Sequence, residues 1–227
     1  MKWKICFLLL LLISIGQIGR AQIYLVAGGN QSVISTSHYP DYLKVNSGYA
    51  WQAGISLNYP FAGNAFLYAG MEYESKKNDW HYLSCCYLDT HETDYSQYFT
   101  VPIGAGIKVF SFDKLSVAVS GGAWVSYAIS GKAEGVTENG DINIPVPYYY
   151  SRELHFGNSS TDDIKRWNLG VQTGTEIKWK NYLIRFRYKY GVTDLANPAS
   201  ASYGPYPSGR YRSFSLDLGY QIISIHK

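Results

Sequence analysis

The sequence has little of what would build a helical membrane protein or a metalloenzyme. Its 227 residues have a mean hydropathy of −0.17, and beyond the N-terminal region no apolar run is long enough for a transmembrane helix. No phosphate-binding loop, HExxH motif or paired-cysteine zinc pattern occurs. Charged residues make up only 16%, and the net charge of +3 is scattered, so nucleic acid is not indicated as a partner. The low mean hydropathy and the lack of a long apolar run exclude a helical bundle in the membrane.

Cysteine is also scarce, with Cys6 near the N-terminus and an adjacent pair, Cys85 and Cys86. Neighbouring cysteines seldom bond each other, because the small ring strains the peptide between them. Without a CxxC partner or a nearby histidine cluster, the pair is a weak indication of metal. We expect two thiols or a strained bridge in an exposed loop, with no metal site and no cofactor.

The N-terminus has the features of a secretory leader. Lys2 and Lys4 precede an apolar segment, residues 5–15, and Gly19 and Ala21 place small residues where a signal peptidase cuts. We therefore expect residues 1–21 to be a cleaved signal peptide and residues 22–227 to be one exported domain.

What the sequence has in excess is tyrosine, 22 residues, arranged with other apolar residues at every second position. Residues 166–192 show this most clearly, on either side of Lys180-Asn181. Such alternation around a two-residue polar break predicts an antiparallel hairpin in which opposed residue numbers sum to 361. One face carries Trp167, Leu169, Val171, Ile177, Tyr182, Ile184, Phe186 and Tyr190, and the other carries Gly170, Gln172, Glu176, Arg185, Arg187 and Lys189.

Strands of about ten residues, tilted near 40°, span about 25 Å, which is the height of the apolar band of an outer-membrane barrel. The apolar face ends in aromatic residues, as a protein at a membrane interface requires. The predicted aromatic girdle consists of Trp51, Tyr59, Tyr127, Trp167, Trp179, Tyr182 and Tyr190. A large secreted barrel of the lipocalin type is the soluble alternative.

The same alternation predicts eight strands: residues 22–32, 49–59, 67–74, 98–110, 115–127, 166–179, 182–192 and 212–222. Between them lie four long polar segments expected to be loops: residues 32–47, 75–97, 128–165 and 193–211. The connections alternate long and short, which puts three tight turns and both termini on one side of the membrane. The predicted fold is therefore all-β, an eight-stranded antiparallel up-and-down transmembrane β-barrel.

Two details of the strands are also predicted. Pro102 lacks the N–H of a ladder hydrogen bond, so we expect a bulge or bend there. Trp124 falls on the inward face, unless a bulge at Gly121-Gly122 reverses it.

Charged residues on the inward face form the candidate site. They are Glu72, Glu74, Lys108, Glu176, Arg185, Arg187, Lys189 and Asp217. An eight-stranded barrel has room only for its own side chains, and unpaired buried charges are costly, so a network of ion pairs is expected. The hairpin register predicts that Glu176 pairs with Arg185, and that Arg187 reaches Asp217 or Glu72. A gated ion path through the same residues is the alternative.

The segments YFTVPIGAGIKV (98–109) and LGVQTGTEIKWKNYLIRFRYKYGVTDL (169–195), with a leader ending in Ala-Gln, resemble the PorT-like outer-membrane β-barrel family. That family is similar in size to the OmpA and OmpX barrels of Gram-negative bacteria. The resemblance covers nearly all of the expected mature chain, and it implies an outer-membrane location.

The expected function is structural or surface recognition through four long extracellular loops, without enzymatic activity. His38, His81, His91 and His155 fall in predicted loops and His226 in the tail, none in a motif with a nucleophile, so no catalytic residue is assigned. The expected partners are outer-membrane lipids and lipopolysaccharide, and a surface ligand or membrane-complex protein. A narrow channel is the first alternative, and an outer-membrane lipid-modifying enzyme is the second.

Overall fold

The computed structural model describes residues 21–35, 43–83, 88–139, 147–157, 159, 162–195 and 209–224. Within these ranges the chain forms nine antiparallel strands in one sheet. The strands are β1 (Gln22–Ser35), β2 (Leu43–Ala62), β3 (Ala65–Leu83), β4 (Leu88–Phe112), β5 (Leu115–Asn139), β6 (Tyr148–Glu153), β7 (Trp167–Trp179), β8 (Tyr182–Gly191) and β9 (Arg210–Ser224). Among the described residues, no helix is long and apolar enough to cross a membrane.

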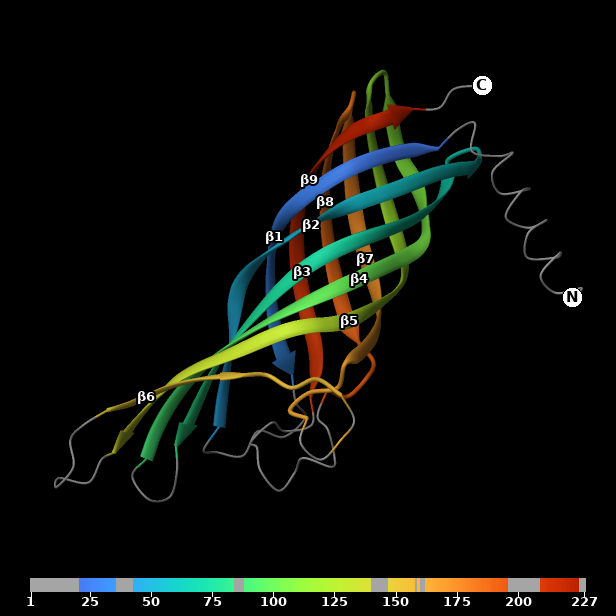
Figure 1. The fold of residues 1–227 in the computed structure, drawn as a ribbon. Coiled ribbons are helices and arrows are strands. Elements are labelled where there is room, and N and C mark those ends of the chain that lie inside the picture. The colour runs from blue at the N-terminus through green and yellow to red at the C-terminus, as the bar shows by residue number, and fades with distance from the viewer. Residues whose placement is uncertain are drawn as a thin grey trace, which may run out of the picture.

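Eight of these strands close on themselves into a barrel (Figure 1). Each pairs with its neighbour in the order β1-β2-β3-β4-β5-β7-β8-β9, and β9 pairs with β1 to complete the ring. Closure removes every free sheet edge from the membrane-spanning wall, where unpaired backbone groups would have no water to bind. The predicted eight-stranded up-and-down barrel is confirmed.

Three tight turns lie at one end of the barrel, where they join β2 to β3, β4 to β5 and β7 to β8. Gly63, Asp113 and Lys180 have positive φ values of 50°, 49° and 55°, as hairpin turns of two residues require. The Lys180-Asn181 turn sets the predicted register, so that Glu176 lies opposite Arg185 and Trp179 opposite Tyr182. Gln22, the first residue of β1, pairs with Ser224, the last residue of β9, and both lie at the same end of the barrel as the tight turns.

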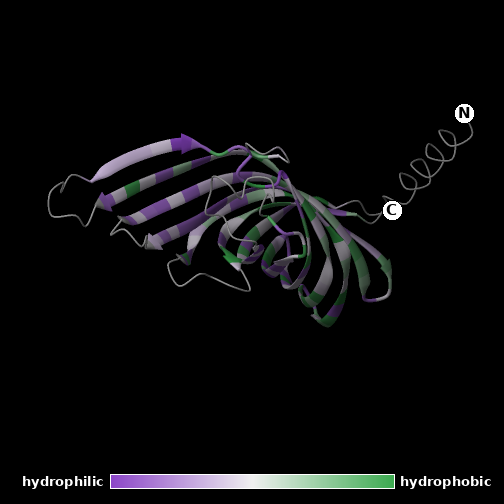
Figure 2. Ribbon diagram, turned by 90° about the horizontal axis from the view of Figure 1, so that it is seen from below, coloured by the Kyte–Doolittle hydropathy of each residue, from purple (hydrophilic) through white to green (hydrophobic). Residues whose placement is uncertain are grey.

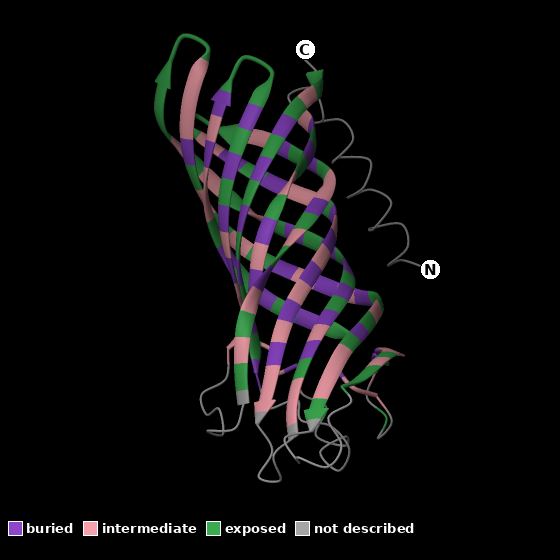
Figure 3. Cartoon of the chain, turned by 90° about the vertical axis from the view of Figure 1, so that its left-hand side faces the viewer, coloured by how far each residue is buried: buried purple, intermediate pink, exposed green. Residues whose placement is uncertain are grey.

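Side chains alternate between buried and exposed along each strand (Figure 3), because successive residues of a strand point to opposite faces. The exposed face of the barrel is apolar, with Ile55, Met71, Ile103, Val171 and Leu218 each at least 49% exposed. An apolar surface that surrounds a closed barrel in this way is typical of a wall that faces lipid. The buried face contains the charged and polar residues.

Two of the polar segments predicted as loops, residues 32–47 and 75–97, are mostly strand, and for them the prediction was wrong. Residues 75–83 continue β3, residues 88–97 continue β4, and residues 128–139 continue β5. The predicted loops at residues 32–47 and 193–211 also begin or end in strand. Beyond the membrane both faces of a strand can be polar, so the apolar alternation on which the prediction rested is lost there. The long ends of β2–β5 and the added strand β6 form a sheet that we call the outer extension (Figure 1).

A bulge or a bend was expected at Pro102, and of these two distortions the bulge is absent. The β3–β4 pairing is interrupted around it but resumes in the same register, with Ala69 opposite Ile103 and Glu72 opposite Thr100. The proline ring instead packs near Gly70, where a Cβ would lie 3.2 Å from its Cγ. Trp124 points inward, as its strand phase predicted, and is 3% exposed.

Candidate functional site

The middle of the lumen is filled by buried charged side chains from β3, β8 and β9. Glu72 lies at the centre: its Oε1 accepts hydrogen bonds from Arg187 Nη1 at 2.7 Å and Arg185 Nη2 at 3.2 Å, and its Oε2 is 3.3 Å from Lys189 Nζ. Each of these side chains is at most 4% exposed. The Glu72 carboxylate therefore contacts three cationic side chains. Their excess positive charge is balanced because other acidic residues bind the same cations.

Asp217 and Glu74 are those other acids. Asp217 Oδ2 accepts hydrogen bonds from Arg187 Nη2 at 2.8 Å and from Arg185 Nε at 3.2 Å, so that both arginines bridge Glu72 and Asp217. Lys189 also contacts Glu74. The predicted contacts of Arg187 with Asp217 and Glu72 are both present.

The predicted pair of Glu176 with Arg185 is wrong, although the two residues are opposed in the ladder as expected. Arg185 instead bonds Asp217, its opposed neighbour in the β8–β9 ladder, and reaches across the lumen to Glu72, at 3.2 Å, and to Ser56 Oγ, at 3.1 Å. Glu176 accepts a hydrogen bond from Asn58 Nδ2 at 3.0 Å and pairs with Lys178 at 3.5 Å. The register determines which backbone segments are neighbours. A long arginine side chain can nevertheless bind a carboxylate on the opposite side of the lumen, as Arg185 binds Glu72.

Two buried lysines were missed. Lys178 belongs to the inward face by simple alternation and lies over the rings of Tyr24 and Phe66, at 5.2 and 5.1 Å. Lys76 was assigned to a loop, yet it is 3% exposed.

Lys76 Nζ lies above three inward aromatic rings, those of Tyr98 at 4.4 Å, Tyr211 at 4.1 Å and Trp124 at 5.4 Å. Such cation–π contacts stabilise a charge that has lost its water. Its nearest acid is Glu74, at 3.9 Å. Lys108, the remaining predicted member of the network, is half-buried, and no ion pair to another described residue is within 4.0 Å.

Above the charged layer the lumen is closed by an apolar cluster. It consists of Ile34, Trp80, Tyr98, Ala128, Ala133, Leu154, Phe156, Ile164, Leu195 and Tyr211. Three of these come from the segment after β6, which folds over the barrel mouth. The backbone holds it there: Leu154 N donates to Gly131 O at 3.0 Å, and Lys165 N donates to Leu195 O at 3.0 Å. The outer end of the lumen is therefore plugged.

The inner face of the outer extension contains a second polar group centred on Glu92. Tyr150 donates a hydrogen bond to Glu92 Oε2 at 2.6 Å, and Arg152 lies 3.4 Å from Oε1 while also pairing with Asp163 at 3.0 Å. Burial and the hydrogen bond to Glu92 raise the pKa of Tyr150 above its ordinary value, so this phenol stays protonated and donating. These contacts fasten β6 to β4.

The predicted girdle residues all lie on the outer face, in two groups. Trp179 stacks on Tyr182 with ring centroids 6.2 Å apart beside the tight turns. At the other end Tyr127 contacts Trp167 at 4.8 Å, and Trp51 stacks on Tyr73 at 5.3 Å. Tyr59, near the turns, and Tyr190, at the outer end, are half-buried.

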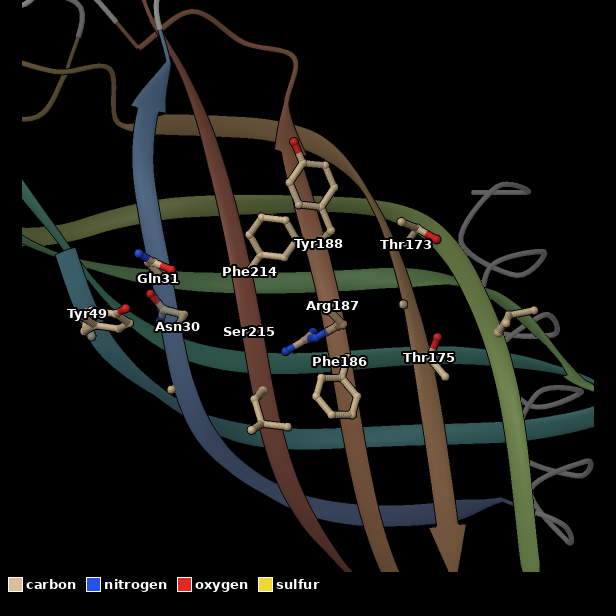
Figure 4. A pocket seen from close by; sticks show the side chains of 15 residues that line it. Asn30, Gln31, Tyr49, Thr173, Thr175, Phe186, Arg187, Tyr188, Phe214 and Ser215 are labelled. Carbon is tan, nitrogen blue, oxygen red and sulfur yellow. The ribbon is translucent and has the colours of Figure 1, made fainter. Parts of the chain in front are cut away.

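A shallow cavity of about 640 Å³ crosses the outer face of the wall (Figure 4). Outward side chains line most of the cavity, among them Tyr49, Phe186, Tyr188 and Phe214. The smaller side chains of Thr173 and Thr175 also line it. It contains no arrangement of side chains suited to catalysis.

The described histidines face carboxylates. His81 and His91 meet at Asp89 on the outer extension, and His155 Nδ1 is 3.8 Å from Asp163. His38 and His226, with Cys85 and Cys86, lie outside the described residues. The apposition of His81 and His91 was not expected from the sequence, because their segment was taken for a loop.

The closed barrel and its apolar wall agree with a comparison of families. A family model described as "Outer membrane protein beta-barrel domain" matches residues 15–197. The chain belongs to this family. It is therefore an outer-membrane β-barrel protein, and the expected location is confirmed at this level. No curated protein matches the chain.

Several solved outer-membrane barrels resemble this member of the family. Ail, the attachment invasion locus protein of Yersinia pestis, is 15% identical, with 89% of this chain and 99% of that chain covered and a TM-score of 0.42. OprG from Pseudomonas aeruginosa is 11% identical, with coverages of 92% and 98% and a TM-score of 0.45. The outer-membrane enzyme PagL is 13% identical, with coverages of 86% and 99% and a TM-score of 0.33. None of these similarities bears on what the protein does.

Proposed function

We propose that this outer-membrane barrel is a surface-recognition protein without enzymatic activity, and that the outer extension is its binding element. The observation that carries the proposal is the length of the outer strands. β4 has 25 residues where β8 has 10, so residues 88–97 extend about 30 Å past the barrel wall. A rigid, paired sheet of this size presents side chains in fixed positions, as recognition requires.

The chemistry of the extension differs from that of the wall. Figure 2 shows hydrophilic bands along the extended strands, whereas hydrophobic bands recur along the strands of the barrel wall. Outward residues of the extension include Lys77, Asp79, Lys132 and Glu134, two ion pairs of 3.4 and 2.5 Å. Tyr148 and Tyr149 on β6 are 68% and 73% exposed. Tyrosine provides contact area at low entropic cost, so the β6 edge suits a protein or glycan partner.

The contents of the lumen argue against the narrow channel. An ion path would need a continuous wet route, but Glu72, Arg187 and Asp217 are ion-paired at the centre of the charged layer and the apolar cluster lies above it. We expect purified protein in planar bilayers to show no steps of conductance in 1 M KCl. Well-resolved conductance steps whose size changes in the Arg187→Leu variant would refute the proposal and show that the barrel is a channel.

The proposal extends to location and partners. It takes the chain as PorT-like, exported by a leader cleaved after Ala21, with residues 22–227 as the mature barrel. Lipid and lipopolysaccharide surround the wall, and a surface ligand or membrane-complex protein binds the extension.

Recognition is tested by photo-crosslinking in intact cells. A photoreactive residue at position 132, outward on the extension of β5, should give a discrete adduct with a protein or glycan. The same residue at position 119, outward on the same strand but against lipid, is the matched control. Lipid adducts alone at both positions would refute recognition.

A deletion gives a second test. Lys77 is opposite Tyr95, so residues 78–94 can be removed and the strands rejoined through an Asn-Gly turn. The shortened barrel should keep its heat-modifiable migration on gels and lose the adduct at position 132. An undiminished adduct would place recognition elsewhere.

A further inference from the structure

Three side chains on two neighbouring strands meet on the outer face of the extension. His81, on β3, is directly opposite His91, on β4. Asp89 lies on β4 two residues before His91. Opposed and diagonal neighbours on one face of a sheet are close enough for their side chains to touch. The ladder, which is paired on both sides of this point, therefore holds the three groups together.

The three groups converge on one oxygen atom. His81 Nε2 is 2.6 Å from Asp89 Oδ1, and His91 Nε2 is 3.5 Å from the same oxygen. The two imidazole rings stack with centroids 4.1 Å apart and planes 11° from parallel, and both Nε2 atoms face Asp89 Oδ1. All three candidate ligand atoms lie within 4.8 Å of one another.

This spacing is close to that of a metal centre. Zinc–ligand bonds of about 2.0–2.1 Å in tetrahedral geometry place ligand atoms about 3.3 Å apart. The His91–Asp89 distance, 3.5 Å, is about 0.2 Å longer than this value, and the His81–Asp89 distance, 2.6 Å, would open by about 0.7 Å, which a rotation of the exposed carboxylate allows. The side chains of His81, Asp89 and His91 are 24%, 41% and 55% exposed, so a fourth position is open to water.

We propose that His81, Asp89 and His91 form a surface site for a divalent first-row transition ion, with zinc as the ion of choice. Two imidazoles and one carboxylate are borderline ligands, which suit zinc or copper better than the oxygen-seeking calcium and magnesium. By the Irving–Williams order copper competes for the same site. Bound metal would clasp β3 to β4 at the far end of the extension. The inference is independent of the proposed recognition function.

Equilibrium dialysis of the full-length protein in detergent, with its purification tag removed, tests the site. Cys85→Ser and Cys86→Ser are introduced together so that no thiol can bind the ion. One Zn²⁺ per chain is expected. His81→Ala, His91→Ala and Asp89→Asn should each weaken binding by about ten-fold or more, because each removes one of three ligands.

The control is His155→Ala, which removes an exposed histidine that also faces a carboxylate, Asp163, elsewhere on the outer side. It should leave zinc affinity unchanged. Heat-modifiable migration on gels shows that each variant is folded. Co²⁺ in place of Zn²⁺ should give the visible absorption of a low-coordinate site, lost in His91→Ala.

Two results would overturn the proposal. One is loss of zinc binding in the serine background, since the thiols would then be the ligands. The other is equal affinity in the three ligand variants and the His155→Ala control, which would leave His81 and Asp89 as an ion pair only.

Discussion

The charged layer makes a prediction about which buried charges depend on each other. Glu72 and Arg187 contact across the lumen at 2.7 Å, whereas Glu176 and Arg185 are opposed in the ladder without a salt bridge within 4.0 Å between these two described residues. Two double-mutant cycles with leucine at each position measure the two couplings. Contact predicts a larger coupling free energy for Glu72 with Arg187 than for Glu176 with Arg185.

The magnitudes follow from what each change leaves behind. Glu72→Leu leaves Arg185, Arg187 and Lys189 with only Asp217 and Glu74, and breaking buried pairs of this kind costs about 3–5 kcal/mol. We expect the upper end of that range. Arg187→Leu should cost nearer the lower end, because Arg185 still bridges Glu72 and Asp217.

The assay is urea unfolding of the barrel in lipid vesicles, followed by tryptophan fluorescence. The double change of Glu72 and Arg187 should cost about 1.5–3 kcal/mol less than the sum of the single changes. The coupling of Glu176 with Arg185 should be smaller by at least about 1 kcal/mol. If the two couplings are equal, or their order is reversed, Glu176 and Arg185 pair as neighbours in the β7–β8 ladder and the described network is wrong.

Three further predictions use other parts of the molecule. Gly122→Ala should destabilise the barrel by about 1–3 kcal/mol, because a Cβ there would lie 2.6 Å from the Tyr68 hydroxyl and 2.2 Å from Ile103 O, while Gly121→Ala, whose Cβ meets nothing nearer than 3.7 Å, should be almost neutral in the same urea assay. An amine reagent that does not cross membranes should label Lys132 in intact cells and spare Lys180, as mass spectrometry of the peptides would show; the opposite pattern would invert the topology. Tyr150→Phe should loosen β6, seen as faster hydrogen exchange of residues 148–153, because the hydrogen bond to Glu92 is lost, whereas exchange equal to that of Tyr149→Phe would show that this bond does not hold the strand.

The wall of the barrel could be predicted from the sequence, because lipid imposes a strict pattern on it. Apolar residues at every second position and the Lys180-Asn181 break were enough to obtain the β7–β8 register, residue by residue. The outer extension has no such constraint, since water wets its outward face. Its inward alternation of Lys76, Asn78, Trp80 and Tyr82 was present but mixed with charge.

The candidate sites were less accessible for the same reason. One partner of Arg185, Asp217, is its neighbour in the β8–β9 ladder, but the other, Glu72, lies on the opposite wall, which local pairing does not specify. The meeting of His81 with His91 depends on the β3–β4 register continuing through a segment that was taken for a loop. Once that register is known, the two histidines are necessarily opposed.

The charged layer has a consequence for how long the folded barrel lasts. Its contacts join residues far apart in the chain, 115 residues for Glu72 with Arg187, and they link β3 to strands that meet it only when β9 has paired with β1. Interactions absent until the last step of folding do not accelerate it, but they must be broken before the seam reopens. The ion pairs therefore act mainly on the rate of unfolding. By slowing it, they lengthen the half-life of the folded barrel in the membrane.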